Sequence, residues 1–199
     1  AKGILNMTDD TQFISTYDFR FGDQDDEYFE LNMSGNAYLF VEDAGDQMRQ
    51  NNGEFHFDIS ENAIMEVARI RARARTEGVT NTVTVRDNGQ IICFDDYFRF
   101  AGGGSDVVVN VLDNGIVDAD GYIGFGEDND FSATATINMS GQLMKGDGWR
   151  MIMDGSASGF TTVNLSSGVI DTGYIESDTD NWVVNICGDG VWIVDGDRV

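Results

Sequence analysis

Short runs in which apolar and polar residues alternate recur along the whole chain, and no proline interrupts them. Phe55, Phe57 and Ile59, for example, alternate with His56 and Asp58. A period of two is typical of strands that bury one face. The 24 glycines, together with Asn and Asp, must then form the turns. The fold expected from this pattern is mainly β, an antiparallel β-sandwich or barrel.

The clearest turn lies between the strand-like runs Thr82–Arg86 and Gln90–Phe94. It contains Asn88-Gly89, a pair that readily adopts the positive φ angles of a tight hairpin turn. We therefore expect a hairpin here. At 199 residues and 41% hydrophobic composition, the chain can bury one sizeable core. We expect a single β-rich domain over residues 1–199, with the Gly-rich loop at 101–105 as the candidate boundary inside it.

One segment departs from this pattern and predicts a helix near residues 61–76. Ser60 can cap the first turn, and Gly78 stands where a left-handed stop residue belongs. Glu61 and Glu66 lie toward the start and several arginines toward the end, the order that the helix dipole favours. A strand is the alternative, because the arginines alternate with apolar residues.

Four arginines account for a third of the 12 cationic side chains, in a chain with 35 Asp and Glu and a formal net charge of -23. They are Arg69, Arg71, Arg73 and Arg75. In a strand all four would share one face. A basic segment on so acidic a molecule predicts contact with carboxylates of another copy. We therefore predict a subunit interface at these arginines, with apolar burial supplying most of the affinity.

The order strand, helix, strand, Asn-Gly turn and strand over residues 54–94 resembles the middle of the tail-tube proteins of long-tailed phages. The resemblance implies two packed β-sheets with a flanking helix, stacked in homo-oligomeric rings around an acidic lumen. It also implies a non-enzymatic virion subunit whose partners are its own copies and other virion proteins. The acidic composition disfavours specific binding to nucleic acid, because phosphate contacts need clustered cations.

Two other functions are consistent with the composition. An acidic surface with only Lys2 and Lys145 as lysines suits strong salt, where self-repulsion is screened. The first alternative is therefore an exported, extracellular surface-layer, pilus or fibre subunit of a salt-adapted microbe. The second is a calcium- or carbohydrate-binding module.

The calcium alternative depends on a segment that resembles an EF-hand loop. Asp118 and Asp120 occupy the third and fifth ligand places and Glu127 the twelfth. Ile116 stands at the first place, where the loop needs a carboxylate. We therefore expect no cofactor, with calcium at these three residues as the alternative.

The residues that could support catalysis are few, and we expect that this protein is not an enzyme. The only histidine, His56, lies between two phenylalanines on a predicted strand. Cys93 and Cys187 lie in apolar runs, which favours buried free thiols over a disulfide. No run approaches the roughly 18 apolar residues that span a bilayer.

Two short patterns recur along the sequence. Glycosylation sequons occur at Asn6, Asn32, Asn138 and Asn164. The stretch Leu31–Gly35 is echoed at Ile137–Gly141, which is too short to establish a repeat.

Overall fold

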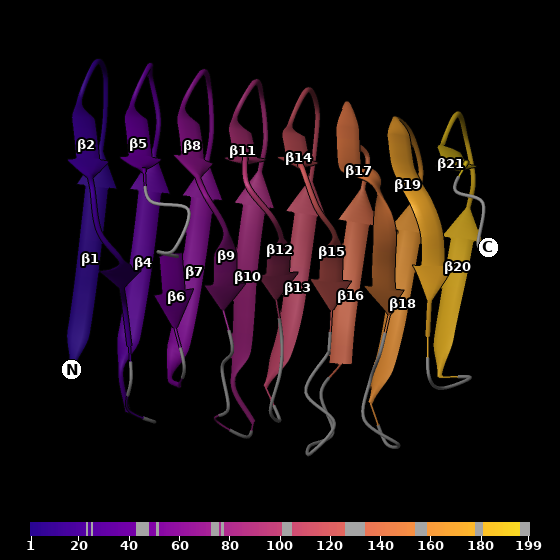
Figure 1. The fold of residues 1–199 in the computed structure, drawn as a ribbon, viewed down its shortest axis with the longest axis horizontal. Coiled ribbons are helices and arrows are strands. Elements are labelled where there is room, and N and C mark those ends of the chain that lie inside the picture. The colour runs from indigo at the N-terminus through magenta and orange to yellow at the C-terminus, as the bar shows by residue number, and fades with distance from the viewer. Residues whose placement is uncertain are drawn as a thin grey trace.

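Parallel strands stack coil upon coil along one axis in the computed structural model (Figure 1). The structure describes residues 1–22, 24, 26–42, 48–50, 52–72, 76, 78–100, 105–125, 134–153, 159–177 and 181–195, and there is no helix in these ranges. Every strand pair among them is parallel. The fold is a β-solenoid.

One sheet contains eight strands, one from each successive coil. In sheet order these are β1 (Lys2–Met7), β4 (Tyr28–Met33), β7 (Glu54–Ile59), β10 (Thr80–Val85), β13 (Asp106–Val111), β16 (Thr134–Met139), β18 (Phe160–Leu165) and β20 (Trp182–Ile186). Strands β1 and β20 therefore form the two edges of this sheet.

The second sheet contains 13 strands in two rows. The first row contains β2 (Gln12–Ser15), β5 (Tyr38–Val41), β8 (Ile64–Val67), β11 (Gln90–Cys93), β14 (Ile116–Ala119) and β21 (Val191–Val194). The second row contains β3 (Phe19–Arg20), β6 (Met48–Gln50), β9 (Ile70–Ala72), β12 (Phe98–Phe100) and β15 (Ile123–Phe125). Two longer strands, β17 (Leu143–Met153) and β19 (Val169–Glu176), join the rows.

Neighbouring coils keep one register, so equivalent residues stack into ladders. Leu5, Leu31 and Phe57 follow one another in one such inward-facing ladder. The amide of Asn32 donates a hydrogen bond of 2.9 Å to Asn6, 26 positions earlier. On the outer face this second ladder continues through Asp58, Thr84, Asn110, Asn138, Asn164 and Asn185.

Alternate side chains of each strand point inward and fill the space between the sheets. In β7, β10 and β13, inner positions are buried and outer ones are half-buried or exposed. Phe55 packs on Phe57 at a centroid distance of 5.2 Å and on Phe100 of the opposite sheet at 5.9 Å. Burial of each such side chain contributes roughly 1.5–3 kcal/mol.

The predicted antiparallel sandwich is wrong, and the predicted hairpin shows why. Strands β10 and β11 belong to different sheets, and the Asp87-Asn88-Gly89 turn is a corner between them. Each strand pairs with its counterparts in the preceding and following coils. A period of two indicates one buried face, and parallel and antiparallel strands share it.

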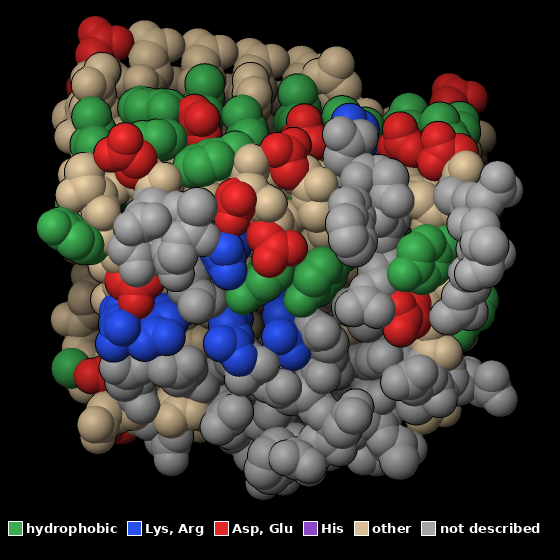
Figure 2. All heavy atoms as spheres, viewed as in Figure 1, with side chains coloured by type: hydrophobic (Ala, Val, Ile, Leu, Met, Phe, Trp, Pro, Cys, Tyr) green, Lys and Arg blue, Asp and Glu red, His purple; other side chains and the backbone are tan. Residues whose placement is uncertain are grey.

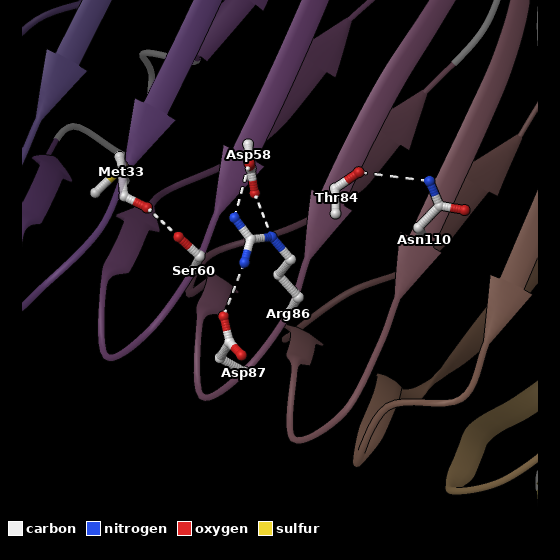
Figure 3. Close-up of polar contacts among 7 residues, drawn as sticks. All are labelled: Met33, Asp58, Ser60, Thr84, Arg86, Asp87 and Asn110. Carbon is white, nitrogen blue, oxygen red and sulfur yellow. Dashed lines mark hydrogen bonds and ion pairs between the residues drawn. The ribbon is translucent and has the colours of Figure 1, made fainter.

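The predicted helix near residues 61–76 is also wrong, because this range contains the strands β8 and β9 and no described helix. Glu61 has a φ of 58°, which is outside the right-handed helical region. The Ser60 hydroxyl donates a hydrogen bond to the carbonyl of Met33 in the preceding coil, so it caps no helix (Figure 3). Gly78, with a φ of 79°, lies in the turn before β10.

The Gly-rich loop considered as a boundary lies mostly outside the described residues. Strand β13, which follows it, pairs directly with β10 of the preceding coil, so the first sheet continues past this point. A search of the described ranges finds no helix that is long and apolar enough to cross a membrane.

Candidate assembly interface

The arginine segment is a strand where the structure describes it. Arg71 points outward from β9, between the buried side chains of Ile70 and Ala72. Arg69 comes directly before the strand, and its Nη2 donates a 2.9 Å hydrogen bond to Oδ2 of Asp95. Arg73 and Arg75 lie outside the described residues. The strand alternative is therefore correct for Ile70–Ala72.

Arg71 belongs to a row of arginines from four coils, which the sequence analysis missed. Arg20 pairs in register with Arg49, Arg49 with Arg71, and Arg71 with Arg99. Blue side chains gather along this face in Figure 2. Neighbouring coils are roughly 4.8 Å apart, so these like charges repel. Asp18 offsets part of this repulsion, because its Oδ2 lies 2.8 Å from Arg20 and 3.8 Å from Arg49.

Arg69 interacts with groups of its own subunit. Burial alone would lower its pKa, but the hydrogen bond to Asp95 and nearby Tyr97, Asp96 and Asp95 raise it. Its guanidinium carbon lies 5.8 Å from the centre of the Tyr97 ring. Contact of the arginine segment with another copy stays a prediction, and Arg69 would have to keep or exchange this intramolecular pair.

The residues proposed for calcium are only partly described. Asp118 lies on β14 and Asp120 in the turn that follows it, while Glu127 is outside the described residues. In the described part of the chain, no group of three His, Cys, Asp or Glu side chains could hold a metal ion.

The single histidine takes part in a surface network. Its Nε2 lies 2.7 Å from Oε1 of Glu54, and its Nδ1 lies 2.7 Å from Oγ1 of Thr82. The ring of Tyr28 lies 5.3 Å away. The pKa of Tyr28 is raised by burial and by its hydrogen bond to Glu30. This arrangement fixes His56 on the outer face of β7.

Apolar side chains are exposed at the C-terminal end of the solenoid. Trp182 and Ile186 pair in register with Thr161 and Leu165, which are buried inner residues of the preceding coil. Trp182 nevertheless stays 40% exposed and Ile186 53% exposed, because no described coil follows. On β21, Ile193 is also exposed, but it pairs with the outer residue Asp171 and points away from the core.

The N-terminal end is open as well. Ile4 on β1 and Ile14 on β2 are 50% and 60% exposed. A cleft of about 360 Å³ opens beside Gly3, with Phe21 and Phe29 among its lining residues. The two ends of the solenoid thus expose apolar side chains and unpaired strand edges. In Figure 1 they lie at opposite ends of the long axis.

The cysteines differ from the expectation of two buried thiols. Both are free, but Cys93 is buried and Cys187 is exposed in the turn between β20 and β21.

Sequence reasoning missed both open ends because it missed the repeat. The sequon asparagines Asn6, Asn32, Asn138 and Asn164 all occupy the same outer ladder. In each sequon an inward apolar residue and a Ser or Thr at the start of the turn follow the asparagine. These sequons therefore mark coils, and their spacing was the signal that could have revealed the solenoid.

Comparison with protein-family models, curated proteins and solved structures finds no match.

Proposed function

We propose that this protein is a non-enzymatic structural subunit, a β-solenoid rod whose copies associate. The observation that carries this proposal is the stack of coils in one register along the described chain. Amide ladders on the outer face and a continuous apolar core join each coil to the next.

A stack of this kind suits a structural role. In a solenoid each coil contacts only its neighbours, so the coils build an extended rod.

The proposal keeps part of what the sequence suggests. A virion component and an exported fibre subunit are both non-enzymatic proteins that associate with their own copies, and the proposal covers this shared class. The element order behind the tail-tube resemblance includes a helix near residues 61–76, where the structure has β8 and β9. That resemblance therefore gives no support to this function.

Sedimentation velocity and negative-stain imaging of the 199-residue chain test this function. We expect the mass to rise with protein concentration and the particles to be elongated. A monomer at every protein and salt concentration, with an intact β circular-dichroism signal, would rule the proposed function out.

A further inference from the structure

We propose that the arginine row of the second sheet binds a linear anionic glycan, whose uronate carboxylates are held by successive coils. The row contains Arg20, Arg49, Arg71 and Arg99, one from each of four coils. It runs along the outer face of β3, β6, β9 and β12, where blue side chains follow one another in Figure 2. Such binding is a second role beside the structural one, because it needs no association of copies.

The row is unfavourable for folding alone. Side chains that pair in register across parallel strands lie roughly 4.8 Å apart, and like charges at that distance repel. Asp18 offsets this repulsion at one end of the row, because its Oδ2 lies 2.8 Å from Arg20 and 3.8 Å from Arg49. Arg71 makes no hydrogen bond or ion pair with any residue that the structure describes. Positions that oppose folding in this way are expected at functional sites.

The first sheet shows, by contrast, a stacking that favours folding. Its outer ladder uses asparagines, and Asn138 donates to Asn110 and accepts from Asn164, at 2.9 and 3.0 Å. An amide both donates and accepts, so these side chains satisfy one another, whereas a guanidinium only donates. A ladder of arginines therefore needs acceptors from outside the row.

The arginines in the middle of the row are poorly hydrated. The side chain of Arg49 is 23% exposed, and Arg99 is 8% exposed. The Nε atoms of Arg49 and Arg71 are buried and have no hydrogen-bond acceptor among the described residues. Opposite charges attract several times more strongly near a protein surface than in bulk water. Because a guanidinium binds a carboxylate through two parallel hydrogen bonds, the row favours carboxylates as its ligands.

The spacing of the row selects a linear ligand. A small anion would neutralise one or two arginines and leave the others opposed. A linear uronate glycan carries one carboxylate on each sugar, and each sugar advances the chain by close to the coil spacing of roughly 4.8 Å. A glycan laid along the row thus brings successive or alternate carboxylates within reach of the long, flexible arginine side chains.

The neighbouring column of side chains argues against a nucleic acid. It contains Arg69, Tyr97 and Tyr122, which directly precede β9, β12 and β15. The guanidinium carbon of Arg69 lies 5.8 Å from the centre of the Tyr97 ring, and the Tyr122 ring of the following coil lies 5.1 Å from it. Tyr97 is thus covered from both neighbouring coils. It offers no free face for stacking with a base, the contact that single-stranded nucleic acids use.

The net charge of -23 confines binding to the row itself, because the molecule repels polyanions at long range. Ionic strength of about 0.15 M shortens the Debye length to roughly 8 Å. Remote carboxylates are then screened, whereas a direct contact between a partly buried guanidinium and a carboxylate is screened much less. We therefore expect binding at this ionic strength.

Titration calorimetry in about 0.15 M salt, with oligogalacturonates and oligomannuronates of increasing length, tests this binding. We expect the affinity for at least one series to rise with length until the chain spans the row, because each further carboxylate reaches another coil. The methyl-esterified oligomer keeps the rings without the charge and should not bind. Equal affinity for the single sugar acid and its oligomers would overturn a linear site. Absence of binding by both series would overturn the glycan site altogether.

Variants of Arg71 separate binding from folding. Arg71→Gln should weaken binding about tenfold, because charge-assisted hydrogen bonds are lost. It should also melt at a higher temperature than the parent chain, because one like charge leaves the row. Arg71→Lys keeps the charge without the paired hydrogen bonds, so its affinity should lie between the two. Lys145→Gln removes one cation from the part of β17 that pairs with β14, and should leave the affinity unchanged.

Other results would assign the row differently. Arg71→Gln with lower stability and unchanged affinity would show that the arginine serves the fold, and would overturn the site. Single-stranded DNA and poly-glutamate of the same charge should bind more weakly than the uronate oligomer. Tighter binding of DNA would identify a nucleic-acid surface, and tighter binding of poly-glutamate a surface for an acidic protein, so either result would overturn the glycan. Sedimentation of the ligand-free chain measures association of copies separately.

Discussion

A left-handed residue recurs at one turn position in successive coils. It is Asp9, Gly35, Glu61, Asp87 and Asp113, with φ angles from 57° to 69°. Four of these five carry a side chain, although the left-handed region favours glycine. The geometry of the coil therefore overrides local preference at this position.

This position gives a prediction for Asp113, which is exposed. Asp113→Gly should be about 1 kcal/mol more stable than Asp113→Ala, because alanine is strained at positive φ and glycine is not. Both variants remove the same carboxylate, so each controls for the other. Urea unfolding measures the difference, and equal stabilities would show that the turn relaxes.

The buried thiol of Cys93 predicts a loss of stability in alkali. Burial raises its pKa well above the ordinary value of 9.0. The unfolded chain then releases this proton at lower pH than the folded chain, so the stabilisation is complete below pH 9.0 and is lost above it. The expected slope reaches about 1.4 kcal/mol per pH unit.

Unfolding in urea between about pH 8 and 10 measures this slope. Cys93→Ala should lose most of it, although the variant is less stable at every pH because of the cavity. Cys187→Ala is the matched control, since its thiol is exposed and its removal should leave the slope unchanged. An unchanged slope in Cys93→Ala would assign the alkaline effect to other groups.

The outer ladder shows how one element stabilises the next. Asn138 donates a 2.9 Å hydrogen bond to Asn110 and accepts one of 3.0 Å from Asn164. Where the ladder has Asp58 instead, Arg86 of the following coil binds both carboxylate oxygens, at 3.1 and 3.2 Å (Figure 3). The hydrogen bond to Asp58 raises the pKa of Arg86.

Removing one amide from the ladder should therefore be costly. Asn138→Ala leaves an acceptor on Asn110 and a donor on Asn164 without their partner, which we expect to cost about 1–2 kcal/mol. Thr136→Ala, on the same face of β16, should cost less and serves as the control. Thermal unfolding of both variants measures the two losses of stability. Similar losses would mean that the hydrogen bonds of the ladder add nothing beyond packing.

Strands could be predicted from the sequence, but their partners could not. Alternation gives the limits of β7, Glu54–Ile59, and nearly those of β11, because each inner position is apolar. Alternation carries no information on which strand pairs with which, and here the partners lie 26 positions away. Asn88-Gly89 therefore predicts a hairpin where the structure has a corner between two sheets. The echo of Leu31–Gly35 at Ile137–Gly141 marks two equivalent coils, but five residues did not establish the repeat.

The candidate site could be predicted only in part, for the same reason. The charge of the arginine segment is evident from the sequence, but its alternation supported only the strand alternative, and the helix was predicted. The stacking of Arg71 on Arg49 and Arg99 depends on pairing between coils, as do the open ends. Ser60 predicted a helix start although it lies before a turn, since a residue type that caps helices also suits a tight turn.

At the scale of the whole molecule, charge opposes folding. The formal net charge is -23, and the described ion pairs involve only a few of the 35 acidic residues. In a solenoid each coil contacts only its neighbours, so repulsion between successive acidic coils adds up along the rod. Screening should therefore stabilise every coil.

Raising salt from about 0.1 M to 1 M shortens the Debye length from roughly 10 Å to 3 Å, which screens charges on neighbouring coils. We expect the melting temperature to rise, because carboxylates on neighbouring coils then repel one another less. Contact between the arginine segment and carboxylates of another copy would instead weaken in salt. Melting curves and sedimentation over the same salt series therefore measure the two effects separately, and a melting temperature that salt leaves unchanged would contradict repulsion between the coils.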